Sequence, residues 1–163
     1  MTVASVNLWG RTIGAVSWDN ERSLGHFEYT PAFSDSGIEV APLMMPLSDR
    51  IYSFPGLPRE TFHGLPGLLA DSLPDRFGNA LIDTWLAKEG RNPASFNPVE
   101  RLCYTGTRGM GALEFTPAAG PSPKQSRSID VQALVELASE ILTQRSRAQG
   151  SFASTDRENA LQD

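Results

Sequence analysis

The sequence predicts an α+β fold, in which a small antiparallel sheet has helices packed on one side. Two observations predict it: strand-type segments fill most of the first 29 residues, and helical apolar spacing follows over residues 59–106. The composition agrees with a globular protein. The 163 residues are 40% hydrophobic and 20% charged, and folding of a chain this long buries roughly 70% of the surface that its unfolded form exposes.

Three short strands are expected at the N-terminal end, as a meander. They are rich in β-branched and aromatic residues, and short turn sequences separate them. Their sequences are VNLW (6–9), TIGAVSW (12–18) and LGHFEY (24–29). A fourth strand is expected over GALEF (111–115). The segment IEVAPLMMPL (38–47) is expected to be extended, because Pro42 and Pro46 would each interrupt a helix.

Three helices are predicted between the third and fourth strands. In the first, over residues 59–73, helical spacing relates Phe62, Leu65, Leu68 and Leu69. The second ends at Gly90, and its expected core face is the stripe Leu73, Phe77, Ala80, Leu81, Thr84 and Trp85. The third begins at Asn97, where Pro98 and Glu100 complete a typical helix start, and it ends at Gly106.

The most concentrated polar feature lies within LPGLLADSLPDRFGNALI, residues 65–82. Two apolar stretches are interrupted there by Asp71, Ser72, Pro74, Asp75 and Arg76. Ser72-Leu73-Pro74-Asp75 matches a capping box, in which Ser72 caps the next helix and Asp75 bonds back to the cap amide. Acidic side chains also favour the positive end of a helix. We interpret these five residues as a structural motif that fixes the angle between two helices.

A catalytic interpretation of the same residues is weaker. Asp71 and Asp75 could form an acid/base pair or bind a hard cation through their oxygens. A cation would require more oxygen ligands close by, and a general base would require a partner within reach. The neighbouring sequence offers neither, so a small independent enzyme that uses these two aspartates is kept only as an outside alternative.

Other candidate residues are given structural roles. His26 and His63 lack a second ligand at metal-binding spacing. The stretch TGTRGMGAL (105–113) lacks the Gly-Lys-Ser/Thr ending of a P-loop and leads into a strand. Gly106 and Gly111 are therefore interpreted as turn residues. No catalytic, cofactor-binding or metal-binding residue is predicted.

Charge and cysteine content limit the function classes. The formal net charge is −5, and without a basic stripe direct binding to nucleic acid is not expected. Cys103 is the single cysteine, so no internal disulfide is possible. We expect it to be a buried, inert thiol. The start MTVASVNLWG does not resemble a signal peptide, and no stretch approaches 18 apolar residues. We expect a cytoplasmic protein without a membrane segment.

The C-terminal part differs in composition. Residues 118–128 are rich in Pro, Ser and Ala and are expected to form a linker. A helix is predicted over residues 129–150, with one apolar face and with Arg145 and Arg147 at its end. Residues 151–163 form a polar tail.

Four segments together resemble the N-terminal region of the HipA family, bacterial serine/threonine kinases of type II toxin-antitoxin modules. The similarity runs from about Val3 to Phe115 and makes residues 1–117 a HipA-like N-terminal domain. Its segments are VNLWGRTIGAV (6–16), APLMMPL (41–47), GLLADSLPDRFGNALI (67–82) and GRNPASFNPVERLCYTGTRGMGALEF (90–115).

The resemblance implies a kinase partner outside these residues. Family members are more than twice as long and carry a glycine-rich ATP loop, a catalytic Asp and a metal-binding Asp downstream. None of these parts occurs in this chain, which is therefore predicted to be inactive alone, with ATP and Mg expected only for the full-length kinase. The helix over residues 129–150 would lead towards that kinase core.

Two functions follow from the resemblance. In the first, the chain is a regulatory and structural module that packs on the kinase core and contacts a small DNA-binding, HipB-like antitoxin. In the second, it is a free-standing module that binds and restrains a separately encoded kinase. Both require a partner surface, and an isolated domain of this kind is expected to expose an apolar patch.

Overall fold

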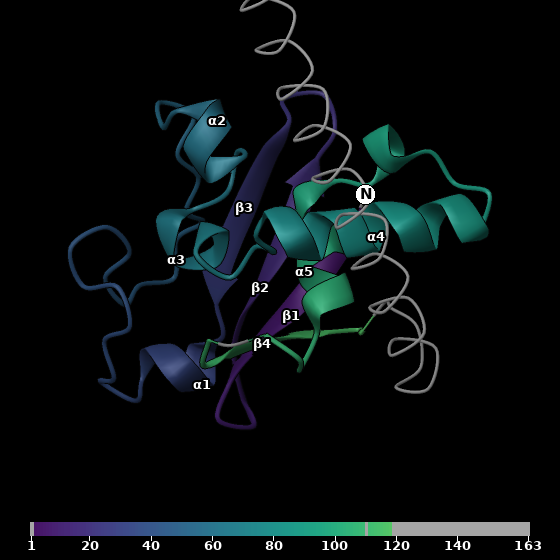
Figure 1. The fold of residues 1–163 in the computed structure, drawn as a ribbon. Coiled ribbons are helices and arrows are strands. Elements are labelled where there is room, and N and C mark those ends of the chain that lie inside the picture. Colours follow the sequence, from purple (N-terminus) through teal and green to yellow (C-terminus); the bar gives the residue numbers. More distant parts are fainter. Residues whose placement is uncertain (1, 110, 119–163) are drawn as a thin grey trace, which may run out of the picture. The chain divides into compact units, whose positions relative to one another are not determined.

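A computed structural model describes residues 2–109 and 111–118 (Figure 1). Its four strands form one antiparallel sheet in the order β3-β2-β1-β4, which confirms the predicted α+β class. The strands are β1 (Thr2–Leu8), β2 (Arg11–Asp19), β3 (Leu24–Tyr29) and β4 (Leu113–Thr116). The helices are α1 (Pro31–Ser34), α2 (Arg59–Phe62), α3 (Gly67–Ala70), α4 (Arg76–Lys88), η1 (Pro93–Ser95) and α5 (Pro98–Thr105). The predicted helix over 129–150, the tail and nearly all of the linker lie outside the described residues.

The sheet buries one face and exposes the other. Strand pairing places Val6 opposite Phe115, and Val16 opposite Phe27, and all four side chains are buried. Neighbouring residues such as Glu28 point to the opposite face and are exposed. This alternation is typical of an antiparallel sheet with one covered face. Helix α5 packs against β1, β2 and β4, and α1 packs against β2.

Turn chemistry sets the two hairpins. Trp9 and Gly10, between β1 and β2, both have positive φ angles, of 50° and 77°, as a two-residue loop that follows the strand twist requires. Between β2 and β3, the Asp19 carboxylate accepts hydrogen bonds from the backbone amides of Glu21 and Arg22, at 2.9 and 3.1 Å. The amide of Arg22 is the main cause that lowers the pKa of Asp19.

The predicted helix over residues 59–73 is wrong in one respect. The structure has two short helices there, α2 and α3, separated by His63 and Gly64 with φ angles of 52° and 80°. The Gly64 carbonyl accepts a hydrogen bond from Gly25 of β3, at 2.8 Å. The Arg59 guanidinium donates to the carbonyls of Arg22 and Ser23 in the β2–β3 turn. Hydrogen bonds to the edge strand β3 and to the β2–β3 turn thus take the place of the hydrogen bonds that a continuous helix would make here.

The segment 38–47 is not extended throughout. A turn closes it, with the Met45 amide donating to the Ala41 carbonyl at 2.8 Å. Met45 is buried, and its carbonyl accepts a hydrogen bond from the Tyr29 hydroxyl at 2.9 Å. Burial is the main cause that raises the pKa of Tyr29 to about 12. As predicted, residues 38–47 form no helix. The segment turns instead of running extended, and the buried Met45 holds this turn against Tyr29.

The predicted core face of the α4 region is correct only for Leu73 and Trp85, which are partly buried and pack against the two core clusters. Helix α4 buries Ile82 and Leu86 in a cluster with Phe96 and Tyr104, to which Trp85 adds. The other residues of the predicted stripe are at most half-buried: Phe77, Ala80, Leu81 and Thr84. Apolar residues occupy more than one side of this helix, so spacing alone could not identify the side that meets Phe96 and Tyr104.

Helix α5 agrees with its prediction at both ends. Asn97 is the N-cap, with Asn97 Oδ1 accepting from the Glu100 amide and Glu100 Oε2 accepting from the Asn97 amide. Gly106, with a φ angle of 54°, ends the helix. Among the described residues, no helix is both long and apolar enough to cross a membrane.

Candidate functional site

The polar motif lies in the connection from α3 to α4, but its capping residue differs from the prediction. Asp75 is the N-cap of α4, and its Oδ1 accepts a hydrogen bond from the Gly78 amide at 2.7 Å. The predicted cap, Ser72, still belongs to the turn that closes α3, because its amide donates to the Leu69 carbonyl. Asp75 has the extended backbone that a cap requires, with φ −69° and ψ −174°.

Pro74 packs directly against the first turn of α4. A Cβ atom added to Gly78 would lie 2.8 Å from the Pro74 Cβ, a distance that real side chains avoid. A glycine at residue 78 therefore lets the proline lie close to the helix, and the pair sets the direction in which the chain enters α4.

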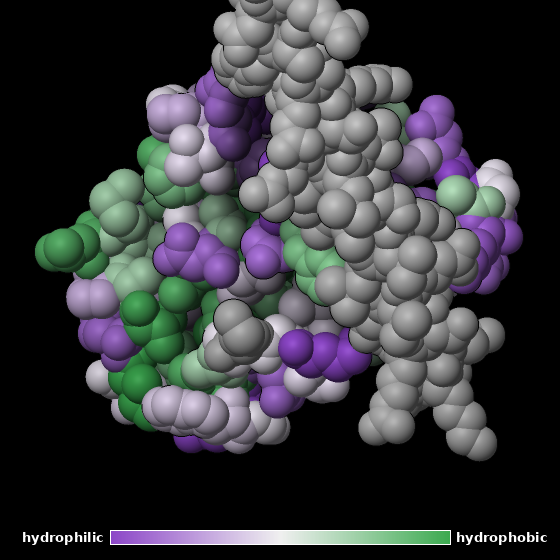
Figure 2. Space-filling model, in the orientation of Figure 1, coloured by the Kyte–Doolittle hydropathy of each residue, from purple (hydrophilic) through white to green (hydrophobic). Residues whose placement is uncertain are grey.

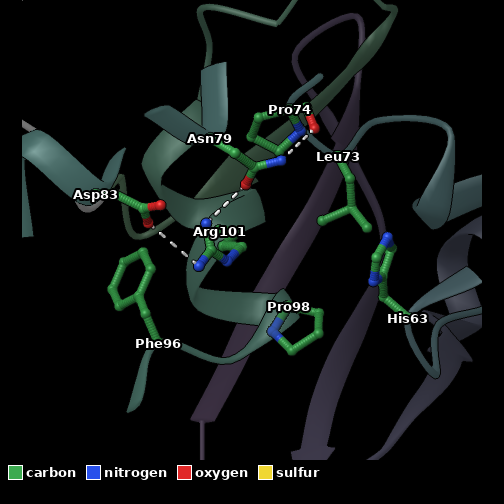
Figure 3. Close-up of a pocket in the computed structure, with 8 residues that line it drawn as sticks. All are labelled: His63, Leu73, Pro74, Asn79, Asp83, Phe96, Pro98 and Arg101. Atoms are coloured by element: carbon green, nitrogen blue, oxygen red, sulfur yellow. Dashed lines mark hydrogen bonds and ion pairs between the residues drawn. The ribbon is translucent and has the colours of Figure 1, made fainter. Parts of the chain in front are cut away.

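Asn79 connects this entry point to α5, and the sequence analysis missed it. Its Nδ2 donates to the Pro74 and Asp75 carbonyls at 2.9 and 3.0 Å, and its Oδ1 accepts from Arg101 Nη1 at 2.6 Å (Figure 3). Arg101 Nη2 also lies 3.6 Å from Asp83 Oδ1. An asparagine in the first turns of a helix is a weak signal for such a role, because its side chain can satisfy nearby backbone groups.

A hollow of about 320 Å³ surrounds this network, and Figure 3 shows its lining. Leu73 and His63 lie on one side, and Asp83 and Phe96 lie on the other. Arg101 lies between them, with its guanidinium directed towards Asn79 and Asp83. The arginine is therefore already engaged by groups of the chain itself.

A larger hollow of about 630 Å³, here called the motif groove, lies between the α3–α4 connection and the loop after α5. It brings together two motifs that are separate in the sequence. Of the predicted residues, Asp71, Ser72, Pro74, Asp75 and Gly111 line it, whereas Arg76 and Gly106 do not. Its further lining is Leu73, Phe77, Gly78, Leu81, Tyr104, Thr105, Arg108, Gly109 and Leu113.

The walls of the motif groove differ in chemistry. Leu73, Phe77 and Leu81 are half-buried and give it an apolar floor. The Arg108 guanidinium donates to the Tyr104 carbonyl and lies 5.0 Å from the centroid of the Tyr104 ring. The Asp71 carboxylate makes no hydrogen bond or ion pair within residues 2–109 and 111–118.

A second apolar feature lies on the loop between α1 and α2. Four large apolar side chains are exposed there, here called the apolar loop surface: Ile38, Leu43, Met44 and Ile51. Leu43 is 94% exposed. Next to it is an apolar hollow of about 250 Å³, lined by Ala41, Met44, Met45, Phe54, Leu57, Phe62, Gly67 and Leu68. In Figure 2 strongly hydrophobic residues gather on the side of the molecule where Figure 1 places this loop.

These features belong to a known type of domain. The family model of the HipA N-terminal domain matches residues 4–116, which include most of β1 and every later strand and helix through β4. The chain belongs to the HipA N-terminal domain family. The resemblance found in the sequence is thereby confirmed. Among curated proteins, none matches the chain.

Cys103, His26 and His63 are the side chains of this HipA N-terminal domain with the greatest potential for reactivity, and each lies in an environment typical of a structural residue. Burial, and to a smaller extent Glu100, raises the pKa of the Cys103 thiol, which disfavours the reactive thiolate. His26 lies 3.9 Å from Asp19, and His63 ends α2 in a left-handed conformation. Within the described part of the chain, no three His, Cys, Asp or Glu residues are grouped as metal ligands would be.

Proposed function

We propose that this HipA N-terminal domain is a binding module for a HipA-like serine/threonine kinase, acting in the cytoplasm as part of a toxin-antitoxin system. In this role it packs on the kinase core and shares in contacts with a small DNA-binding antitoxin. Phosphoryl transfer, with its ATP and Mg, is assigned to residues of the full-length kinase, and the chain alone is inactive.

The apolar loop surface carries this proposal. Leu43 and Met44 project from a loop that is held by the buried Met45, so ordering them against a partner costs little backbone entropy. Exposed apolar side chains grouped beside an apolar hollow are typical of an interaction surface. Methionine side chains adapt readily to the shape of a partner.

The alternative is a free-standing module that restrains a separately encoded kinase. Both roles use the same surface and differ in whether kinase and module share a polypeptide. The reading frame beyond codon 163 distinguishes them: continuation into a glycine-rich loop and kinase motifs supports the first, and a stop codon beside a kinase gene supports the second.

Co-purification with the kinase tests the proposal. The double variant Leu43→Asp, Met44→Asp, placed in the module or in the full-length chain, is expected to lose association with the kinase core at least about tenfold, since two charges would be buried in the contact. Ala87→Asp, at an exposed position of α4, is a control for an added acidic residue elsewhere on the surface and is expected to bind normally. Equal binding by all three proteins would contradict the proposal, as would phosphorylation of a target by residues 1–163 alone.

A further inference from the structure

We propose that the motif groove binds a basic amphipathic helix of a partner protein. This inference concerns a surface other than the apolar loop surface and goes beyond the function proposed above. It depends on the shape of the groove, on apolar side chains along its floor and on acidic side chains at its rim.

The floor has the spacing of a helix-binding groove. Phe77 and Leu81 lie four residues apart on α4, which places them on one side of the helix, and Leu73 lies in the segment that leads to the N-cap Asp75. Helix α4 uses Ile82 and Leu86, on another side, for its own core. Phe77 and Leu81 are therefore apolar and half-buried without belonging to either core cluster, whereas Leu73 packs against the sheet core, and a second helix can cover this pair with side chains one turn apart.

The rim determines the charge of the occupant. Asp71 and Asp75 are exposed and both line the groove. Asp75 uses its Oδ1 to cap α4, and no described cation pairs with either carboxylate. Arg108 also lines the groove, but it is one cation against two carboxylates among the described lining residues and it already donates to the Tyr104 carbonyl, so a Lys or Arg beside the apolar side chains of the occupant would be attracted to the wall formed by Asp71 and Asp75. The net charge of −5 likewise disfavours a second copy of this chain as the occupant.

The remaining lining leaves room for a backbone. Gly109 and Gly111 line the groove after α5. A Cβ atom added to Gly111 would have no neighbouring atom within 4 Å, so packing inside the chain does not require a glycine at this residue. An incoming helix can approach closely at such a position.

Two synthetic peptides of about 18 residues, or five helical turns, test the proposal. They share one leucine face and differ only in having a lysine or a glutamate polar face. In fluorescence anisotropy titrations of the full chain, the lysine peptide is expected to bind at least about tenfold more tightly, and its affinity is expected to fall as salt screens the charges. Equal affinity of the two peptides would overturn the proposal.

Matched variants separate the groove from general charge attraction. Asp71→Asn with Asp75→Asn removes two charges, and the fold is retained because asparagine is as effective an N-cap as aspartate. Glu21→Gln with Glu39→Gln makes the same change, from −5 to −3, at exposed positions outside the groove. The first pair is expected to lower affinity for the lysine peptide about tenfold, and the second is expected to leave it unchanged. Equal losses in both pairs would overturn the proposal.

The binding position can also be observed in the unmodified chain. On addition of the lysine peptide, the backbone amide resonances of Gly78, Gly109 and Gly111 are expected to shift. Shifts confined to residues 38–51 would mean that the peptide covers the apolar loop surface instead, and the proposal would be wrong. Neither peptide experiment involves the kinase, so its result is independent of the test of the proposed function.

Discussion

The side chain of Asn79 accepts a hydrogen bond from Arg101 at 2.6 Å while its amide group donates to the Pro74 and Asp75 carbonyls. One residue of α4 thereby connects the proline-containing entry of this helix to α5. The lining of the motif groove comes from this entry segment and from the end of α5, so the position of its two walls relative to each other depends on the connection through Asn79.

We expect Asn79→Ala to lower the free energy of unfolding by about 1 to 3 kcal/mol, because a part-buried arginine loses a hydrogen-bond partner. Urea denaturation measures this change. Thr84→Ala is the control on the same helix: it removes an exposed local hydrogen bond to the Ala80 carbonyl and is expected to cost less than about 0.5 kcal/mol. Equal costs for the two variants would show that the connection to Arg101 contributes nothing.

The helix cap provides a second prediction. Asp75→Ala is expected to lower the free energy of unfolding by about 0.5 to 2 kcal/mol, because the Gly78 amide loses its acceptor. Ser72→Ala is expected to have little effect, because the serine is not the cap, and Asp75→Asn is expected to be nearly neutral. Thermal unfolding compares the three variants. A larger loss for Ser72→Ala than for Asp75→Ala would mean that the helix begins earlier than the structure has it.

Sequence reasoning succeeded where one residue type determines the local backbone. Asn97, Pro98 and Glu100 predicted the start of α5, and Gly106 predicted its end. The strands followed from their composition and turns, except that β1 begins at Thr2 rather than at the predicted Val6 and leaves Trp9 in the turn. These signals depend on neighbouring residues alone, so packing against distant segments does not change them.

Reasoning from sequence failed where distant segments decide between similar local choices. Both Ser72 and Asp75 are good capping residues, and the closing turn of α3 selects the second. Leu81 and Ile82 are equally apolar, and contact with Phe96 and Tyr104 selects Ile82 for the core. The motif groove was not predicted, because it depends on two motifs that only the fold brings together.

Gly64 is predicted to be intolerant of any side chain. Its φ angle is 80°, and a Cβ atom would lie 2.4 Å from the Ser23 carbonyl oxygen, so Gly64→Ala combines backbone strain with a clash. Gly90 has a similar φ angle of 68° but open space around it, so Gly90→Ala isolates the cost of the backbone strain alone, about 1 to 2 kcal/mol. Urea denaturation should show Gly64→Ala to be less stable than Gly90→Ala by a further amount of about 1 kcal/mol or more, the lower end of overpacking costs. Equal stability would mean that the α2–α3 break can move away from β3.

The buried Tyr29 hydroxyl predicts how stability depends on pH in alkali. The pKa of Tyr29 is raised from 10.0 to about 12 in the folded protein, so above pH 10 the unfolded chain loses this proton while the folded chain keeps it. The free energy of unfolding should therefore fall by up to about 1.4 kcal/mol per pH unit between pH 10 and 12, whereas below pH 10 this contribution is fully present. Tyr29→Phe removes the hydrogen bond to the Met45 carbonyl and should be less stable at pH 8, but its decline between pH 10 and 12 should be shallower. Urea denaturation of both proteins across this pH range gives the two slopes, and identical slopes would assign the alkaline loss of stability to groups other than Tyr29.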